Sequence, residues 1–349
     1  MALLKVGILT QSEAKCAEPL KEAVLALEEE GVEVILNKCA ADKVNEKGLP
    51  NDEIKADMYI LIGNDKFILN FLLSRPDEKI KILPVSPINE AGFLSEINIA
   101  ELETISKLIS ERKWSIEKRT RLQCVINGSK CPPLLNDLTI FSKKSATLIR
   151  YTLIINDERM WRDGADGVIV TTPTGSTGYS LSAGGPIIGT NSAVFGITPV
   201  NSINLSRRAL IVPDESKIKI TEIESSSGIS VVLDGQKRVS LNSNEIQIWK
   251  SDNPVEFITF SKSSLAEIQD KLKQKIDLFD IATDIPPSAK LILKILEYEG
   301  KLTQRELIEE SKLPPRTVRY ALSLLLEQGL ITKRTMLRDS RFSIYSIKK

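Results

Sequence analysis

A run of hydroxyl and glycine residues between Thr171 and Pro186, TTPTGSTGYSLSAGGP, has the composition of a ligand-binding loop. Glycine and proline interrupt the run so often that no regular helix or strand can extend through it. Its backbone amides and its hydroxyl groups therefore remain available to a polar ligand. A glycine-rich surface turn is the simpler alternative, but the run is too long and too rich in hydroxyls for a plain connection.

Histidine is absent from all 349 residues, which excludes imidazole bases, histidine triads and histidine metal ligands. Acid–base chemistry in this chain must use carboxylates, lysine, tyrosine or water. The four cysteines, Cys16, Cys39, Cys124 and Cys131, form no C-x-x-C pair, so they predict neither a zinc site nor a disulfide framework. We expect them to be small buried hydrophobic side chains, and we predict no metal-ligating residues.

Apolar runs alternate with helical patterns near the N-terminus, which predicts an α/β layer with a parallel sheet. The expected strands are Leu3–Thr10, Val32–Lys38, Asp57–Gly63 and Lys81–Ser86, and the expected helices are Ala14–Glu30 and Ile99–Arg112. Because ligands bind beyond the carboxyl ends of the strands in such sheets, the residues that follow each strand are candidates for a site.

From Trp114 onward the chain consists of short β-rich runs, separated by turns expected at Asn127-Gly128 and Asp163-Gly164. This pattern predicts an all-β domain of two packed sheets. The strand-like segment Gly167–Thr171 leads directly into the glycine-rich loop. No apolar run approaches the ~18 residues that a membrane span needs, and no signal peptide is evident, so we expect a cytoplasmic protein that does not enter a membrane.

The last part of the chain follows a linker-like segment at 280–287 and has three helical patterns and two short strands. The helices are expected at Ser288–Glu299, Thr303–Ser311 and Pro315–Gln328. Thr303 and Glu306 have the spacing of a capping box, and Pro315 suits a first helical turn. Residues 288–349 thus resemble the winged helix-turn-helix domain of bacterial and archaeal transcription regulators.

This C-terminal segment is basic, since residues 286–349 contain 13 Lys or Arg and 7 Asp or Glu, whereas the other 285 residues contain 34 and 39. A third helix that buries Val318, Ala321, Leu322 and Leu325 presents its other face to DNA bases, and the wing meets phosphates. The predicted DNA-binding residues are Arg316, Thr317, Arg319, Tyr320, Lys333, Arg334, Arg338 and Arg341. A winged-helix dimerisation module with ordinary solvated charges is the alternative.

The glycine-rich run resembles the signature T-P-T-G-S-T-A-Y-S-L-S-A-G-G-P of the NAD kinase family, with Gly178 in place of an alanine. The resemblance extends to about residue 275 and includes a closing helix at 264–276. It implies an α/β domain at 1–113 that is completed by 255–279, and a β-sandwich domain at 114–254. It also implies that NAD or NADP binds between these domains, and that the protein forms homodimers or homotetramers.

Three more loops resemble the dinucleotide site of that family. Leu135-Asn136-Asp137 stands where the family has an Asn-Glu pair on the nicotinamide-side ribose, and Leu233–Gln236 matches a D-G-Q turn. Ile197–Asp214 follows I-T-P-x-x-P-H-S-L-S-x-R-P-x-V-V-P-D, with Ile203 in place of the histidine. The resemblance assigns dinucleotide binding to Asn136, Asp137, Thr174, Ser176, Thr177, Gly178, Tyr179, Ser182, Asp234 and Gln236.

The side of the site that receives the phosphate donor departs from the family pattern. Gly63-Asn64-Asp65-Lys66-Phe67 replaces G-G-D-G-T, in which the aspartate activates the acceptor hydroxyl, so Asp65 is the catalytic residue if the protein is active. Glycines there let the backbone approach phosphate oxygens, and Lys66 would enter that space. Alternatively, Lys66 supplies a tethered cation. In Ser86–Ile97, Gly92-Phe93-Leu94 match the family while Pro87 and Asn89 do not, and Phe93 and Leu94 are expected mainly in the core.

These features support two hypotheses from different classes. In the first, an NAD-kinase-like protein with impaired catalysis senses NAD(H) or NADP(H) and regulates transcription by binding DNA. In the second, an active NAD kinase transfers phosphate from ATP or polyphosphate, with Mg²⁺, to the 2′-hydroxyl of NAD, and the winged helix is an appendage. We favour the first, because the dinucleotide side is better kept than the donor side.

Overall fold

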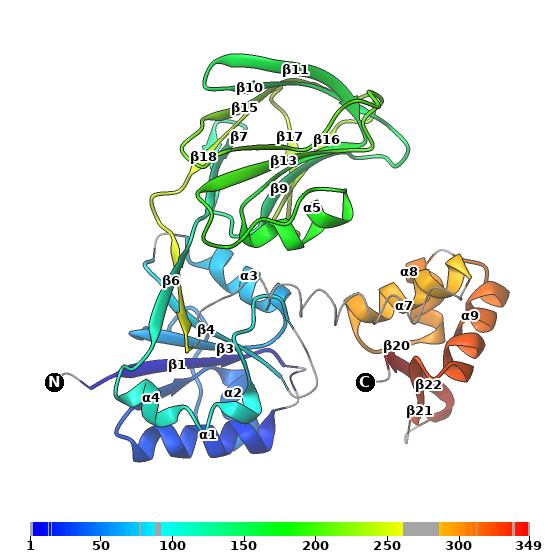
Figure 1. The fold of residues 1–349 in the computed structure, drawn as a ribbon. Coiled ribbons are helices and arrows are strands. Elements are labelled where there is room, and N and C mark those ends of the chain that lie inside the picture. The colour runs from blue at the N-terminus through cyan, green and yellow to red at the C-terminus, as the bar shows by residue number, and fades with distance from the viewer. Residues whose placement is uncertain are drawn as a thin grey trace. The chain divides into compact units, whose positions relative to one another are not determined.

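The apolar runs near the N-terminus form a seven-stranded sheet in a computed structural model that describes residues 3–12, 14, 16–76, 78–87, 92–260, 286–311, 313–336 and 339–347. The strand order is β2-β1-β3-β4-β19-β6, and β5 also pairs with β4. Figure 1 labels β1, β3, β4 and β6 of this sheet. Neighbouring strands are parallel except β19 and β6. The strands are β1 (Lys5–Thr10), β2 (Glu33–Leu36), β3 (Met58–Ile62), β4 (Lys81–Ser86), β5 (Ile97–Asn98), β6 (Ser115–Arg119) and β19 (Val255–Thr259).

Helices cover both faces of this sheet, because successive strand side chains point to opposite sides. Ile8 packs in a cluster with α1 (Ala17–Glu29), α2 (Lys38–Val44) and α4 (Ser106–Ser110). The next residue, Leu9, packs in a second cluster with α3 (Asp65–Ser74). Figure 1 shows α1 and α3 on opposite sides of the strands. This arrangement confirms the predicted α/β layer and places α3 directly after the carboxyl end of β3.

The helix expected at Ile99–Arg112 is broken into a short 3₁₀ turn, Ile99–Glu101, and α4. The Asn98 side chain accepts a hydrogen bond from Ala100 N, and the Glu101 carboxylate accepts one from Asn98 N at 2.7 Å. This capping box tightens the first turn, and regular helix resumes only at Ser106.

The all-β region forms two antiparallel six-stranded sheets that enclose one apolar core, as the sequence predicts. One sheet has the order β11-β10-β15-β18-β7-β8, and the other has the order β14-β13-β12-β9-β16-β17. Their strands are β7 (Leu122–Ile126), β8 (Ser129–Lys130), β9 (Asp137–Ser142), β10 (Ile149–Ile155), β11 (Glu158–Ala165), β12 (Gly167–Thr171), β13 (Val194–Val200), β14 (Leu210–Pro213), β15 (Ile218–Glu224), β16 (Ile229–Leu233), β17 (Lys237–Leu241) and β18 (Ile246–Lys250).

The sandwich is an insertion into the first sheet. β6 pairs with β19, although the sequence places residues from 114 onward in the all-β domain, and β19 returns from the sandwich to lie between β4 and β6. A β-rich pattern cannot show which sheet a strand joins, because that depends on pairing with Val255–Thr259 far along the chain. The chain therefore passes twice between the two layers of the unit Met1–Ser263.

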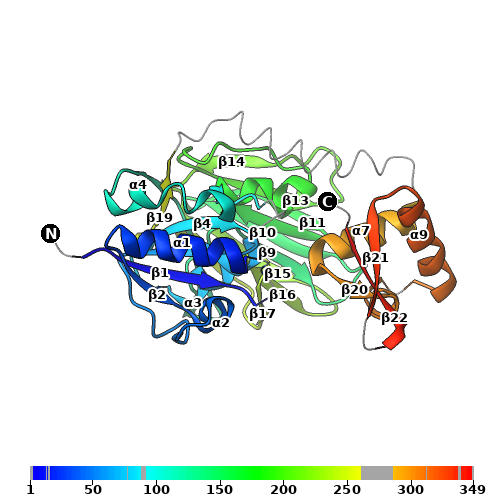
Figure 2. The same cartoon turned by 90° about the horizontal axis from the view of Figure 1, so that it is seen from below.

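The second compact unit, Ser264–Lys349, has the predicted winged helix-turn-helix elements. They are α7 (Pro287–Glu299), β20 (Leu302–Thr303), α8 (Gln304–Ser311), α9 (Pro315–Glu327), β21 (Ile331–Met336) and β22 (Asp339–Ile347), and the sheet order is β20-β22-β21 (Figure 2). The capping box is confirmed, since Thr303 N donates to the Glu306 carboxylate at 2.7 Å and Glu306 N donates to Thr303 Oγ1 at 3.3 Å.

Two expectations fall outside the described residues, namely the closing helix at 264–276 and residues 280–285 of the linker. Among the helices that the structure describes, none is long and apolar enough to span a bilayer.

Candidate functional site

The N-terminus of α3 begins at the carboxyl end of β3, where the sequence places the altered phosphate loop. The Asn64 side chain caps the helix by accepting a hydrogen bond from Phe67 N at 3.0 Å. Asn64 N donates to the Gln11 side chain at 3.5 Å. The Phe67 ring lies against Gly63, where an added Cβ would be 2.7 Å from its Cδ1. The amides of Phe67 and Asn64 thus already donate to side chains of the protein, and the Phe67 ring fills the space at Gly63.

Asp65 is held by the segment that follows β4. Its carboxylate accepts hydrogen bonds from Phe93 N and Leu94 N, both at 3.1 Å. Gly92 is needed for this close approach, because a Cβ there would lie 2.6 Å from an Asp65 carboxylate oxygen. Leu94 is buried in the α3 cluster, as expected, and Phe93 is half-buried. Pro87 is buried, whereas Asn89 lies outside the described residues.

Arg119 is a neighbour of Asp65 that the sequence reasoning missed. Burial lowers the pKa of Arg119, while the nearby carboxylates of Glu117, Glu96 and Asp65 oppose that shift. Its guanidinium lies 3.8 Å from the centroid of the Phe257 ring. Nothing in the local sequence of β6 identified it, because the partner Phe257 arrives on β19 after the whole sandwich.

The loop 135–137 is gathered around one buried carboxylate. Asp234, on the turn after β16, accepts hydrogen bonds from the amides of Leu135 at 2.9 Å, Asn136 at 2.7 Å and Asp137 at 3.0 Å. Asp137 is also buried, and Thr139 Oγ1 donates to its carboxylate at 3.1 Å. Asp234 and Asn136 are therefore parts of one cluster, although 98 residues separate them.

Burial raises the pKa values of both carboxyl groups in this cluster. Burial raises the pKa of Asp137 to about 6, and burial together with the neighbouring Asp137 raises the pKa of Asp234 to about 7. The Oδ1 atom of Asn136 is buried and has no hydrogen-bond partner among the described residues. Such an acceptor left unsatisfied costs about 1–3 kcal/mol, so a ligand group that donates to it would be stabilised.

The glycine-rich loop packs directly on this cluster and forms two short turns, Thr174–Thr177 and α5 (Tyr179–Ser182). Thr172 Oγ1 donates to Leu135 O at 2.5 Å and accepts a hydrogen bond from Gly175 N at 3.1 Å. A Cβ on Gly175 would collide with the Asn136 backbone. Glycine is thus required at this position by close approach of two backbones, and Thr172 is a second anchor that sequence reasoning missed.

The predicted residues of this loop face different surroundings. Ser176 is fully buried, and its hydroxyl donates to Pro173 O at 2.7 Å and accepts a hydrogen bond from Ile188 N at 3.0 Å, so it supports the loop from inside. Thr174 is buried, Thr177 and Gly178 are half-buried, and Ser182 is exposed. Tyr179 is 43% exposed and contacts Phe141 in a tilted arrangement, with ring centroids 5.7 Å apart and the ring planes at 59°.

Gln236 connects the sandwich to the first sheet. Its side-chain oxygen accepts a hydrogen bond from Asn70 of α3 at 3.1 Å, and its side-chain nitrogen donates to Asp234 O at 3.2 Å. Leu135 is buried in the apolar cluster that contains Leu94, with Phe67 packed against it. The loop at 135–137 and the N-terminus of α3 therefore meet in the apolar cluster that contains Leu135 and has Phe67 packed against it.

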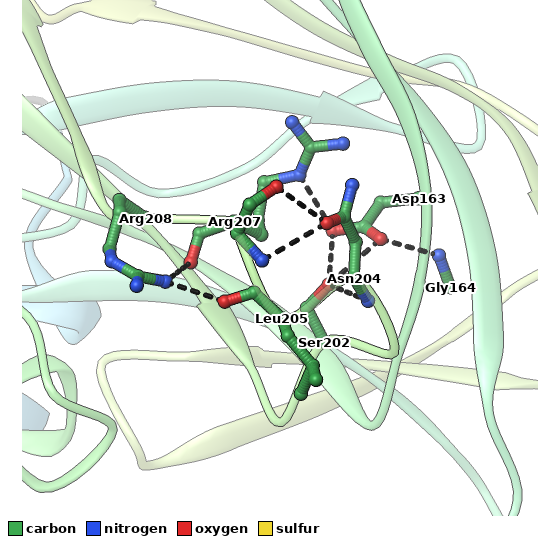
Figure 3. A network of polar contacts seen from close by, with 8 residues as sticks. Asp163, Gly164, Ser202, Asn204, Leu205, Arg207 and Arg208 are labelled. Atoms are coloured by element: carbon green, nitrogen blue, oxygen red, sulfur yellow. Dashed lines mark hydrogen bonds and ion pairs between the residues drawn. The ribbon is translucent and has the colours of Figure 1, made fainter.

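The loop between β13 and β14 forms a separate polar network, which Figure 3 shows around the Asp163 carboxylate. Asp163 accepts hydrogen bonds from Ser202 Oγ, from Gly164 N and from Arg207 Nε at 3.1 Å. The predicted turn at Asp163-Gly164 is wrong, because both residues lie within β11; Asn127-Gly128 does form a turn. Gly164 instead gives space to Ile203, whose Cδ1 would lie 2.9 Å from a Cβ there.

A pocket of about 250 Å³ lies beside this network, between the end of the glycine-rich loop at Gly184 and the segment 198–209. Arg208 borders it and donates to Leu205 O at 2.8 Å and to Arg207 O at 2.9 Å. Within the described part of the chain, no group of three or more Cys, Asp or Glu side chains is arranged to hold a metal ion.

In the second unit, one face of α9 is buried and the other is open. Val318, Ala321, Leu322 and Leu325 are buried, as predicted. Arg316, Arg319 and Tyr320 are exposed on the same helix, Thr317 is half-buried, and Lys333 is exposed on β21. Arg334 and Arg341 lie on the two wing strands, but their side chains are outside the described part of the structure, as is the whole of Arg338.

An α/β layer with an inserted β-sandwich, and a glycine-rich loop packed on an Asn-Asp pair whose acceptor atoms are buried, define the NAD-kinase-like class of nucleotide-binding proteins. Residues 135–260 match the ATP-NAD kinase C-terminal domain, and residues 287–332 match the winged helix-turn-helix DNA-binding family. The NAD kinase of Methanopyrus kandleri is 31% identical over 271 residues, which cover 76% of this chain and 96% of that protein. The chain belongs to the NAD kinase family and carries a winged helix-turn-helix domain in addition.

Other relatives agree with this assignment. The NAD kinase of Thermococcus gammatolerans is 31% identical over 283 residues, which cover 78% of this chain and all of that protein. Among solved structures, an NAD kinase from Archaeoglobus fulgidus in complex with ATP aligns with a TM-score of 0.63 and 25% identity, over 77% of this chain and 99% of that one. Yeast NADH kinase complexed with NADH aligns with a TM-score of 0.68 and 24% identity, over 78% and 88%.

Proposed function

We propose that this protein binds NAD(H) or NADP(H) at the loops around Asp234, that its phosphoryl transfer is impaired, and that the bound dinucleotide controls DNA binding by the winged helix. One contrast carries the proposal. The loops on the dinucleotide side leave a buried acceptor, Asn136 Oδ1, without a partner among the described residues. At the N-terminus of α3, in contrast, Phe67 N donates to Asn64, the Phe67 ring fills the space at Gly63, and Asp65 accepts the amides of the segment after β4.

The dinucleotide side fits its ligand chemically. A ribose offers hydroxyl donors, and the unpartnered Asn136 Oδ1 and the Asp137 carboxylate are acceptors on adjacent residues. Tyr179, backed by Phe141, presents an aromatic face that suits an adenine or nicotinamide ring. Yeast NADH kinase, which has a similar fold, is complexed with NADH in its solved structure, and this supports the same class of ligand here.

The donor side does not fit a triphosphate. Phosphate binding at a helix N-terminus needs free amides, but Phe67 N already donates to Asn64 and Asn64 N donates to Gln11. The Asp65 carboxylate accepts two hydrogen bonds from the segment after β4. Lys66 is exposed and makes no ion pair among the described residues, so it adds a long side chain in front of the helix. We therefore assign no catalytic step to ATP or Mg²⁺.

The deciding experiment combines calorimetry with an assay of NADP formation. Purified full-length protein is titrated with NAD, NADH, NADP and NADPH, and is then incubated with NAD, Mg²⁺ and either ATP or polyphosphate. We expect binding of at least one dinucleotide without turnover. The Lys66→Gly and Asn64→Gly/Lys66→Gly/Phe67→Thr variants restore the family residues, and turnover gained only in them would show that these side chains closed the donor site. Rapid turnover by the unaltered protein would contradict the proposal.

A second function, active NAD kinase, is favoured by one observation: Asp65 is retained in the first turn of α3 at the carboxyl edge of the sheet. In that case Asp65 must leave the Phe93 and Leu94 amides to accept the proton of the acceptor hydroxyl. Any turnover should then disappear in Asp65→Asn. Turnover that is unchanged by this substitution would exclude Asp65 as the base.

We also propose a homodimer or homotetramer. Its support is the segment 203–211, in which three large apolar side chains are exposed: Leu205 at 91%, Ile203 at 64% and, on the edge strand β14, Ile211 at 42%. Contiguous exposed apolar residues are typical of interfaces between protein chains. Light scattering of the full-length protein checks the number of chains, and a monomer at micromolar concentration would contradict it.

A further inference from the structure

Two cysteines outside the proposed ligand site face each other across a tight hairpin. Val125 pairs with Lys130 and Ile126 pairs with Ser129, so that Cys124 of β7 stands opposite Cys131, the residue after β8. Cys131 N donates to Cys124 O at 2.9 Å. The chain reverses at Asn127-Gly128, where both residues have positive φ. The two thiols are therefore held in register by main-chain hydrogen bonds.

The environments of the two thiols differ. Cys124 is fully buried in the sandwich core, whereas Cys131 is half-buried at the end of an edge strand. The contact with the Cys124 thiol, assisted by Lys237, lowers the pKa of Cys131 to about 7, and the same contact raises the pKa of Cys124. Of the two thiols, Cys131 is thus the one that ionises more readily, and a thiolate is the nucleophilic form of cysteine.

We propose that Cys124 and Cys131 are an oxidation site that forms a reversible disulfide with peroxide as the oxidant, and that this disulfide displaces the loop at 135–137. The effect on dinucleotide affinity rests on the function proposed above, whereas the disulfide and the loop displacement do not.

The chemistry needs only the two thiols and one peroxide. The Cys131 thiolate attacks a peroxide oxygen, the O–O bond breaks, and the departing hydroxide takes a proton and leaves as water, which gives a sulfenic acid. The Cys124 sulfur then forms the S–S bond, the S–O bond breaks, and the hydroxyl leaves with the Cys124 proton as a second water. The two sulfurs lose two electrons in total, and the peroxide gains them.

Formation of the bond must move the hairpin. Directly opposite residues of an antiparallel pair have Cβ atoms about 5 Å apart, while a disulfide needs about 3.8 Å, so the strands must approach by about 1 Å. Gln123 is hydrogen-bonded to Cys131 O at 2.6 Å, and Leu134 is paired with Leu122 by two hydrogen bonds of 2.8 Å. A shift at Cys131 therefore reaches Asn136 through a short segment that is anchored on the same strand.

The charge of Asp234 provides a second link between the thiols and the loop. Asp234 contributes to the raised pKa of Cys124, and the same carboxylate accepts the amides of Leu135, Asn136 and Asp137. The disulfide removes the thiol whose charge this carboxylate acts on and draws β7 and the end of β8 together. We expect these three amides to become less protected.

The first test is chemical. Full-length reduced protein is treated with equimolar hydrogen peroxide, alkylated, digested and analysed by mass spectrometry. We expect a cross-linked peptide pair that contains Cys124 and Cys131 and has lost two hydrogens, reversed by dithiothreitol, with Cys16 and Cys39 still alkylated. A Cys131→Ser variant should form no cross-link, whereas a Cys39→Ser variant should behave as the wild type. Failure of the wild type to cross-link, or preferential oxidation of Cys39, would overturn the proposal.

The second test measures, in two independent ways, whether the disulfide displaces the loop at 135–137. Hydrogen exchange of the peptide that covers residues 134–137 should be faster after oxidation in the wild type and unchanged in Cys131→Ser. Dinucleotide affinity by calorimetry should weaken by about fivefold or more on oxidation and recover on reduction. If reduced protein binds no dinucleotide, the function proposed above fails, and the exchange result alone decides this inference. Identical exchange in the oxidised and reduced forms would overturn it.

Discussion

Asp137 sits in a buried position with a single side-chain donor, Thr139, and its pKa is raised to about 6 by burial. The Asp234 carboxyl is its charged neighbour, and no cation is paired with either carboxyl among the described residues. Because folding raises the pKa of Asp137 and Asp234 above the ordinary value, the native state binds extra protons. The unfolding free energy should therefore decrease as the pH rises through about 4 to 7.

The Asp137 carboxylate should also make NAD binding depend on pH. An ionised Asp137 accepts a ribose hydroxyl, whereas a protonated one competes as a donor, so affinity should rise with pH and level off above about 6. The expected loss is about tenfold per pH unit below that value. Calorimetry with NAD between pH 5 and 8 measures it, and Asp137→Asn should give weaker binding without this dependence. The same pH profile in Asp137→Asn would assign the titration to another group such as Asp234.

Residue chemistry was predictable from sequence where one short motif carried it. The motif around Thr174 to Ser182 located the glycine-rich loop, and Asn136, Asp137 and Asp234 do gather around it. The sequence did not show that Asp65 is held by the Phe93 and Leu94 amides, because that contact joins two loops 28 and 29 residues apart. The position of Arg119 near Asp65 could not be predicted for the same reason, since its burial beside Phe257 depends on the tertiary structure.

At the scale of elements, the glycine-rich loop and the loop at 135–137 behave as one unit because their backbones touch at Gly175. Gly175→Ala should place a methyl group against the Asn136 backbone, which cannot give way without breaking its hydrogen bonds to Asp234 and Thr172. We expect a loss of about 1–3 kcal/mol in unfolding free energy, together with loss of dinucleotide binding. Thermal unfolding and calorimetry measure the two effects.

Gly178→Ala is the matched control in the same loop. Its φ of −89° is common for any residue although its ψ of −131° is unusual, and an added Cβ would lie 3.2 Å from Gly175 O, which requires a shift of a few tenths of an ångström. We expect this variant to bind dinucleotide within about twofold of the wild type. Equal behaviour of the two alanine variants would contradict the close approach as the reason for Gly175.

Elements with strong local signals were predicted, and those set by distant pairing were not. The apolar periodicity of α1 and α9 and the capping box at Thr303 needed only neighbouring residues. The segment after Asn98 has helical spacing, yet its capping box closes a 3₁₀ turn first. The strand β6 reads as part of the sandwich because its partner β19 lies more than a hundred residues away.

At the scale of the whole molecule, the net positive charge of residues 286–349 and the exposed Arg316 and Arg319 on α9 predict DNA binding. Affinity for a random-sequence duplex, measured by fluorescence anisotropy on the full chain, should fall steeply with salt because phosphate contacts release counterions. Arg319→Ala should weaken binding and reduce the salt slope by about one if it contacts a phosphate.

Arg305→Ala is the control, since Arg305 is an exposed arginine on α8 that pairs with Glu309 at 3.1 Å. Footprinting on genomic fragments, with and without the dinucleotide found by calorimetry, then tests regulation. Affinity that does not respond to salt, or equal effects of the two arginine variants, would contradict DNA binding through α9. A protected site that is indifferent to dinucleotide would leave DNA binding but remove ligand control.

Because β19 returns to the first sheet, that sheet can be completed only after the sandwich strands have been synthesised. The edge of β4 at Lys81 and Ile82 pairs with Glu256 and Phe257, so these positions stay open on the ribosome while every sandwich strand is being made. An exposed strand edge is a site of aggregation. The sandwich can therefore fold before the layer that precedes it in the chain, and a product truncated before residue 255 would carry a finished sandwich on an unfinished, association-prone sheet.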